Sequence, residues 1–193
     1  MTAMVAGSTE VVSMLLESGA NIESVNVNGS SAFEYASAVG RQKNLQCWLE
    51  RVKNWDLNRQ NTVLGGCALG NAVYMGANKL ETVKVLLDAG ASLDYRTFSG
   101  GNALAGAIDN EDSDPDVVRI VLEKLKTSCS PEEFASIVKY KRKSTTMKWK
   151  SIYFAARALY RAGLLKTGLM YSLAIDSGTS ALNLAVIRGD VEI

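Results

Sequence analysis

The chain has 193 residues, 47% of them hydrophobic and 21% charged, which is the composition of a folded globular protein. With 21 Lys and Arg against 20 Asp and Glu, the formal net charge of +1 gives no general attraction to nucleic acid or anionic membranes. The chain contains no histidine, which removes the usual general base and the most frequent metal ligand. We therefore expect no catalytic, metal or cofactor site.

Compartment is indicated by targeting signals and cysteine usage. No apolar stretch approaches the roughly 18 residues of a membrane span, and the N-terminus lacks the basic and apolar regions of a signal peptide. Cys47, Cys67 and Cys129 are widely spaced and form no C-x-x-C pair. These features predict an intracellular protein in a reducing compartment, the cytoplasm or the nucleus first, with an organelle as the alternative.

The first helical pattern, EVVSMLLESGANIE from Glu10, recurs along the chain. Related stretches are NLQCWLERVKNWDLN from Asn44, ETVKVLLDAGASLD from Glu81 and DVVRIVLEKLK from Asp116. Their apolar residues fall at i, i+3 and i+4, the stripe of an amphipathic helix. The pairs Gly19-Ala20 and Gly90-Ala91 are typical helix ends, and Trp48 is predicted to be a core residue, whereas Trp55 fits either a core or a contact position.

A second frame, G-x-x-A-[L/F]-x-x-A, alternates with these helices. It reads GSSAFEYASAVG from Gly29, GGCALGNAVYMG from Gly65, GGNALAGAI from Gly100 and GTSALNLAVIRGDVEI from Gly178. The first three starts are 36 and 35 residues apart, a period typical of stacked repeats. The last alanine of the frame is small enough for close packing of neighbouring helices: Ala36, Ala72, Ala107 and Ala185.

These two patterns together resemble the ankyrin repeat family over residues 1–126 and 178–193. The Thr, Pro and His of the family motif are replaced, for instance by Ser31, Ala32 and Glu34, so these repeats are diverged. The resemblance implies an all-α fold, an α-solenoid of stacked ankyrin-type helix-turn-helix repeats with projecting turn loops. The expected units are 1–28 (partial), 29–64, 65–99, 100–130, 131–177 and 178–193 (partial).

The region between Gly100 and Gly178 is irregular. Asp114 and Pro115 are predicted to cap a helix, and Ser130 with Glu133 forms a capping box. We expect residues 131–177 to contain an insertion and a degenerate repeat whose helix starts near Met147, and an inserted helical hairpin is the competing interpretation.

Three stretches resemble chemical motifs without meeting their requirements. The acidic stretch DNEDSDPD lacks the glycine and the terminal glutamate of a calcium loop. The turns GGCALG and GGNALAG lack the contexts of phosphate-binding loops. Cys67 has no histidine or nearby cation, so a packed thiol is expected.

The resemblance implies protein binding through the turn tips and the inward side of each first helix. The tips are expected at residues 23–28, 59–63 and 95–98. Exposed aromatic and Arg side chains are frequent in binding hot spots. The candidate residues are Tyr95, Arg96, Phe98 and Arg59 at the tips, and Glu34, Tyr35, Asn71, Tyr74 and Asn183 on the helices. The alternative is that Phe98 packs under its own turn and that Tyr95 is exposed without binding a partner.

The favoured function is a non-catalytic scaffold or adaptor, free or in a larger assembly. The targeting region of a multidomain enzyme is an alternative. A third is nucleic-acid or anionic-lipid binding through a basic segment, which the remaining sequence does not reinforce. That segment comprises Lys139, Lys141, Arg142, Lys143, Lys148, Trp149 and Lys150. Since neither end carries a polar capping repeat, we also expect further repeats or a capping partner.

Overall fold

The fold was analysed in a computed structural model, which describes residues 1–76, 79–109, 114–167, 169–176 and 178–188. These residues form twelve α-helices, and their only strand-like feature is an isolated antiparallel bridge between Val25 and Ser31. The chain divides into two compact units, Met1–Tyr95 and Arg96–Ile193, each of which is described by itself.

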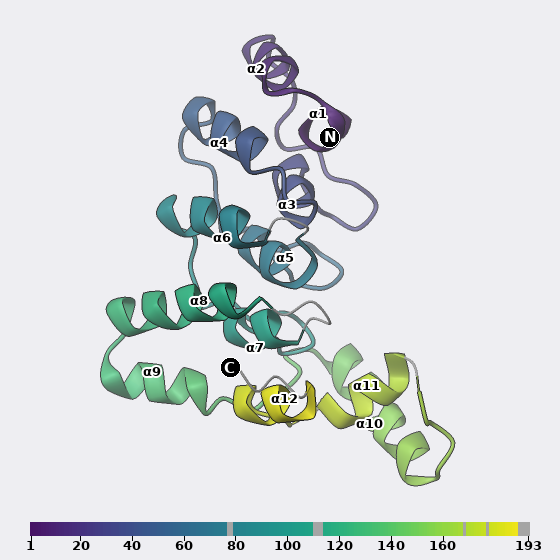
Figure 1. The fold of residues 1–193 in the computed structure, drawn as a ribbon. Helices are drawn as coiled ribbons and strands as arrows, with labels where there is room; N and C mark the ends of the chain where they lie inside the picture. The colour runs from purple at the N-terminus through teal and green to yellow at the C-terminus, as the bar shows by residue number, and fades with distance from the viewer. Residues whose placement is uncertain (77–78, 110–113, 168, 177, 189–193) are drawn as a thin grey trace. The chain divides into compact units, whose positions relative to one another are not determined.

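The first unit consists of three helical pairs (Figure 1). The first helices of successive pairs pack on one another, α1 on α3 and α3 on α5, and the second helices do the same, α2 on α4 and α4 on α6. The pairs are α1 (Thr2–Ala6) with α2 (Thr9–Glu17), α3 (Ala32–Ala38) with α4 (Gln42–Arg51), and α5 (Ala68–Met75) with α6 (Lys79–Asp88).

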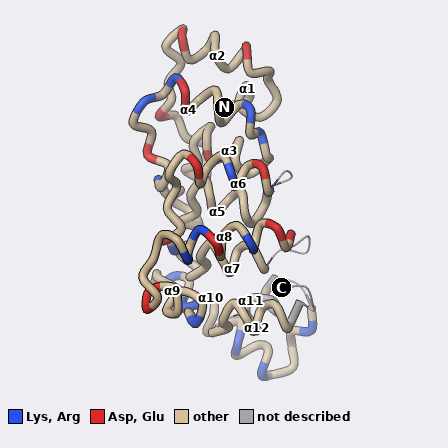
Figure 2. The backbone as a smooth tube through the Cα atoms, turned by 60° about the vertical axis from the view of Figure 1, so that its left-hand side comes forward, with Lys and Arg blue, Asp and Glu red and all other residues tan. Residues whose placement is uncertain are grey.

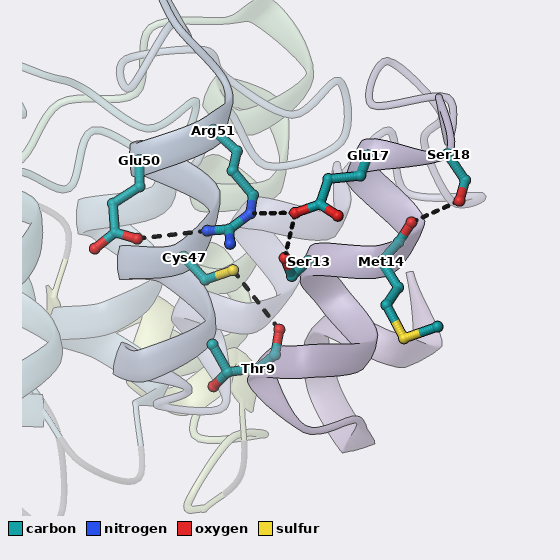
Figure 3. Close-up of polar contacts among 8 residues, drawn as sticks. All are labelled: Thr9, Ser13, Met14, Glu17, Ser18, Cys47, Glu50 and Arg51. Atoms are coloured by element: carbon teal, nitrogen blue, oxygen red, sulfur yellow. Dashed lines mark hydrogen bonds and ion pairs between the residues drawn. The ribbon is translucent and has the colours of Figure 1, made fainter.

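Polar contacts join α2 to α4 (Figure 3). The Glu17 carboxylate accepts hydrogen bonds from the Arg51 guanidinium at 3.5 Å and from the Ser13 hydroxyl at 2.8 Å. The Cys47 thiol donates to the Thr9 carbonyl at 3.7 Å. Deeper in the contact, the buried Asn44 amide donates to the carbonyls of Met4 and Gly7 at 3.0 and 3.1 Å. One side chain thus satisfies backbone acceptors of the preceding pair.

Glycines terminate helices and turn the chain where the sequence predicts. The first glycine of the frame has a positive φ in all four copies: +72° at Gly29, +67° at Gly65, +88° at Gly100 and +85° at Gly178. This conformation is costly for residues that carry a Cβ atom. At the predicted helix ends, the amides of Ala20 and Ala91 donate to carbonyls five residues earlier.

The core of the first unit is built from the small and large positions of the frame. Ala36 and Ala72 are fully buried, as predicted. Phe33 packs against Trp48, with ring centroids 5.9 Å apart, and Trp55 covers Trp48 at 5.1 Å. Trp48 is therefore a core residue as predicted, and Trp55 borders the same aromatic cluster.

The second unit begins with a helical pair of the same kind. Asp114 and Pro115 cap α8 and Ser130 with Glu133 forms a capping box on α9, which confirms both predicted starts. α7 packs on α8, α8 on α9, α10 on α11, and α12 on α7. The helices are α7 (Ala103–Ile108), α8 (Pro115–Ser128), α9 (Pro131–Val138), α10 (Met147–Arg161), α11 (Leu169–Asp176) and α12 (Ala181–Arg188).

Helices α10 and α11 lie within a turn. In the preceding turn, the Thr97 amide donates to the Gly101 carbonyl, and the Gly100 amide donates to the Thr97 carbonyl. Arg142 makes the same two bonds with Thr179 and Gly178. Residues 143–177, 35 in number, therefore stand where the preceding turn has two, Phe98 and Ser99. Because α12 packs on α7, this arrangement favours an inserted helical hairpin over a degenerate repeat.

Candidate protein-binding surface

The turns before α3, α5 and α7 are each closed by one polar side chain. The Asn26 side-chain oxygen Oδ1 accepts from the amides of Asn28 and Ser30, at 2.9 and 3.0 Å. In the next turn, Asn61 accepts from two backbone amides, the shorter bond being 2.8 Å. Thr97 takes this role in the third turn, since its hydroxyl accepts from the Gly101 amide at 2.8 Å. Internal hydrogen bonds thus hold the tips in place.

The first two turns expose apolar side chains. Val27 is 98% exposed, and Leu64 is 52% exposed. The two turns lie side by side, because a Cβ atom added to Gly29 would lie 2.3 Å from the Thr62 hydroxyl. The exposed apolar residues of these tips, which we name the tip surface, are Val25, Val27, Val63 and Leu64. The predicted tips 23–28 and 59–63 contain Val25, Val27 and Val63, but none of these residues was among the predicted contact residues, and Leu64 lies just outside the predicted range.

Four of the five predicted residues of the first helices lie on the neighbouring helices α3 and α5. Tyr35 on α3 and Tyr74 on α5 are 44% and 49% exposed, so both are accessible. Asn71, half-buried on α5, donates from its amide to the Glu34 carbonyl at 3.3 Å and links the two helices. Asn183 is exposed on α12, in the other unit.

Arg59 is accessible in part. Its guanidinium pairs with the Glu23 carboxylate of the preceding turn at 2.6 Å and lies 5.9 Å from the ring centre of Trp55. Since 31% of the Arg59 side chain is exposed, it forms part of the surface while bridging two repeats.

Two predicted contact residues are buried, which corrects their assignment. Tyr95 is 6% exposed because its ring packs against Gly70, where an added Cβ atom would be 3.1 Å from ring atoms. Gly70 replaces the His of the family motif, and the missing side chain leaves room for the ring. Glu34 is 2% exposed because it folds back onto the start of α3, where it accepts from the Ser31 amide. Neither side chain is available to a partner.

The third tip is covered within its own unit. Arg96 lies over the Tyr140 ring, 4.7 Å from the ring centre, and the Phe98 carbonyl accepts from the Thr145 amide at 3.0 Å. Both Arg96 and Phe98 are half-buried. The chain entering α10 lies against this turn, so its tip is less open than the first two.

The predicted basic segment divides into two groups. Arg142 is internal: its guanidinium pairs with the Asp109 carboxylate at 3.2 Å, and the two side chains are 11% and 4% exposed. Trp149 is half-buried against Tyr153, with ring centroids 6.1 Å apart. The other predicted members are exposed: Lys139, Lys141, Lys143, Lys148 and Lys150. Arg142 is therefore corrected from a surface cation to a structural one.

The remaining predictions concern Cys67 and the acidic stretch DNEDSDPD. Cys67 is fully buried, and burial raises the pKa of its thiol, as expected of a packed residue. Within the described ranges, no cluster of three or more Cys, Asp or Glu residues is arranged to hold a metal ion. Residues 110–113 of the acidic stretch are not described. Among the helices that are described, none is long and apolar enough to cross a membrane.

Glu34 is predicted to make the stability of the first unit depend on pH. Burial raises the pKa of the Glu34 carboxyl, while hydrogen bonds from Ser31 act in the opposite direction, and its Oε1 atom is buried with no hydrogen-bond partner among the described residues. The unfolded chain ionises first, so stability is lost as the pH rises from about 4.3, the ordinary Glu value, through the raised pKa. Glu34→Gln preserves the capping box and removes this loss.

We expect Glu34→Gln to gain stability relative to wild type as the pH rises from 4.5 to 8, because the neutral amide carries no charge into the buried site. Urea titrations between pH 4.5 and 8, followed by the fluorescence of Trp48 and Trp55, measure this difference. Glu50→Gln on the exposed side of α4 is the control. Parallel pH profiles for wild type and Glu34→Gln contradict the assignment.

The stacked helical pairs and projecting turns define a helix-turn-helix repeat solenoid, a class whose extended surfaces generally bind proteins. No protein-family profile matches the chain. Over 120 residues it is 32% identical to rat "Ankyrin repeat and SAM domain-containing protein 6" and 31% identical to the mouse protein. Each alignment covers 62% of this chain and 13% of the relative, so the chain spans a small part of these proteins.

The crystal structure of the ankyrin repeat protein EF0377 has the same fold. It superimposes with a TM-score of 0.66 over 99% of this chain and 74% of the other, at 23% sequence identity. The repeats of this chain have the ankyrin repeat fold, as the two recurring sequence patterns predict. This supports a general role in protein interaction.

Proposed function

We propose that the chain is a non-catalytic scaffold or adaptor whose first unit binds a protein through the tip surface and the exposed side of α3 and α5. The observation that carries this proposal is the exposure of Val27 and Leu64 on turns that internal hydrogen bonds hold in place. Exposed apolar residues on a fixed backbone lose little conformational freedom on binding.

The composition of this surface supports a protein partner. Burying one Val or Leu side chain contributes about 1.5–3 kcal/mol. Tyr35 and Tyr74 add aromatic area next to polar groups, the combination found in binding hot spots. Arg59 and Glu23 supply a charged edge. An apolar centre with a polar rim is the usual anatomy of a protein interface.

The double variant Val27→Ser/Leu64→Ser tests the proposal. Both side chains project into solvent, so we expect the thermal unfolding of the variant to match wild type. Loss of about 1.4 kcal/mol at either position lowers affinity about tenfold. Tagged full chains are purified from cells of the native source, and co-purifying proteins are quantified by mass spectrometry. A partner recovered in a constant ratio with wild type should be depleted at least tenfold with the double variant.

Met14→Ser is the matched control. Met14 is 65% exposed on α2, in the same unit but outside the tip surface. The proposal requires that Met14→Ser retain the partner. Equal recovery with all three chains, or loss with Met14→Ser alone, overturns the assignment of the surface.

A further inference from the structure

The segment that leads into the inserted hairpin and forms most of it has an unusual charge distribution. Nine of the 21 Lys and Arg residues of the chain, and none of its 20 Asp and Glu residues, lie between Lys139 and Ile175. The remaining sequence carries twelve basic and all 20 acidic residues. The near-zero net charge of the whole chain therefore conceals a strongly basic element. We name residues 139–175 the basic hairpin.

Most of these cations are available at the surface. Arg142 is paired with Asp109, but the other eight are exposed, and none makes an ion pair with any residue that the structure describes. In Figure 2, blue Lys and Arg segments recur along α10 and the loop that follows it. The eight exposed cations are Lys139, Lys141, Lys143, Lys148, Lys150, Arg157, Arg161 and Lys166.

The same element exposes large apolar side chains. Phe154 is 75% exposed and Met147 74% on α10, and Leu164 is 71% exposed in the loop after it. Phe154 lies in a row with Lys150, Arg157 and Arg161, whose spacing of i, i+4, i+7 and i+11 places them on one side of the helix.

A neighbouring side of α10 fixes the helix to the repeats of its own unit. Tyr153 is 2% exposed, and its hydroxyl donates to the Ser99 carbonyl at 3.0 Å. Ala156 is fully buried, and the Thr145 amide bonds to the Phe98 carbonyl. The exposed row therefore belongs to an anchored helix and not to a loose tail.

We propose that the basic hairpin docks the protein on an anionic phospholipid surface. Its exposed cations face the headgroups, and Phe154, Met147 and Leu164 enter the interface between headgroups and acyl chains. This inference concerns the second unit and stands independently of partner binding by the tip surface.

Two observations favour an anionic membrane as the surface that the basic hairpin binds. Cations distributed over the 139–145 segment, α10 and the following loop, with no acidic residue among them, match a surface that is negative over an extended area. Nucleic acids and anionic membranes both provide such a surface. A phosphate backbone offers no apolar environment for exposed aliphatic side chains, whereas a lipid interface does. Phe154 suits either surface, because nucleic-acid bases stack on aromatic rings, but the aliphatic Met147 and Leu164 favour the membrane.

Co-sedimentation of the full chain with vesicles tests this proposal. The vesicles are phosphatidylcholine alone or with about 30% phosphatidylserine, an anionic lipid of cytoplasmic leaflets. We expect at least tenfold stronger partitioning onto the phosphatidylserine vesicles. The charge reversal Lys150→Glu/Arg157→Glu/Arg161→Glu should abolish this preference. Phe154→Ser should lower partitioning at least threefold at a salt concentration that weakens charge attraction.

The matched control reverses three exposed cations outside the basic hairpin, Lys43→Glu/Lys53→Glu/Lys124→Glu. It changes the net charge equally and should retain binding. Circular dichroism verifies that every variant keeps its helix content. Wild type that does not prefer phosphatidylserine vesicles overturns the proposal, as does equal loss with the control. Binding to single-stranded RNA without binding to vesicles also overturns it, and an unchanged Phe154→Ser variant contradicts insertion into the interface.

Discussion

Replacing Arg142 by alanine is expected to lower the free energy of unfolding of the second unit by about 3 kcal/mol, the range found when one partner of a buried ion pair is removed. The guanidinium lies 3.2 Å from the Asp109 carboxylate, and both side chains are nearly inaccessible. The truncation leaves a buried carboxylate without this partner and also removes packing at the base of the turn. Urea unfolding followed by far-UV circular dichroism measures the loss.

The controls separate the ion pair from general damage to the segment. Lys141→Ala, one residue away and exposed, should change stability by less than about 0.5 kcal/mol. The double variant Asp109→Asn/Arg142→Met should cost clearly less than the sum of its two single variants, because each removes the charge that the other leaves unpaired. Additive losses would show that the two side chains do not depend on each other.

Gly100→Ala is expected to lower the free energy of unfolding by about 3 kcal/mol, as much as Arg142→Ala. Gly100 has a φ of +88°, which costs a residue with a Cβ atom about 1–2 kcal/mol. The added Cβ atom would also lie 2.1 Å from the Lys143 carbonyl oxygen. Because that neighbour is backbone, the chain entering α10 must shift, and the overpacking adds a cost of about 1–3 kcal/mol. Thermal unfolding of the purified variant measures the sum of these two costs.

Gly178→Ala is the matched control for this prediction. Gly178 is the first glycine of the same frame, with a φ of +85°, but its added Cβ atom would meet no atom within 4 Å. We expect only the conformational cost, about 1 kcal/mol. Equal destabilisation by the two substitutions would mean that residue 143 does not lie against the turn at Gly100.

Local signals in the sequence were sufficient to predict the repeats. The frame glycines, the Gly-Ala helix ends and the Ser130–Glu133 capping box each depend on a few neighbouring residues, and the structure confirms them. The buried frame alanines follow from the same regularity. An array in which each repeat contacts its neighbours can be predicted from one unit and its period.

Features that depend on contacts distant in sequence were not predictable. The burial of Tyr95 depends on Gly70, 25 positions earlier, and the structural role of Arg142 depends on Asp109, 33 positions earlier. Both residues have types that are common at binding surfaces, so composition alone indicated exposure. The placement of α10 and α11 within a turn depends on the pairing of Arg142 with Thr179 across residues 143–177, whose patterns resemble those of a repeat.

Replacement of residues 143–177 by Phe-Ser, the two residues of the preceding turn, tests the central claim that α12 continues the stack on α7. Amide hydrogen exchange read by mass spectrometry compares the protection of residues 103–108 and 181–188 in the full chain and the shortened one. If residues 143–177 are an insertion in a turn, both segments keep their protection and the remaining chain unfolds cooperatively. Loss of protection in both segments would contradict the claim and show that residues 143–177 are an integral repeat of the array.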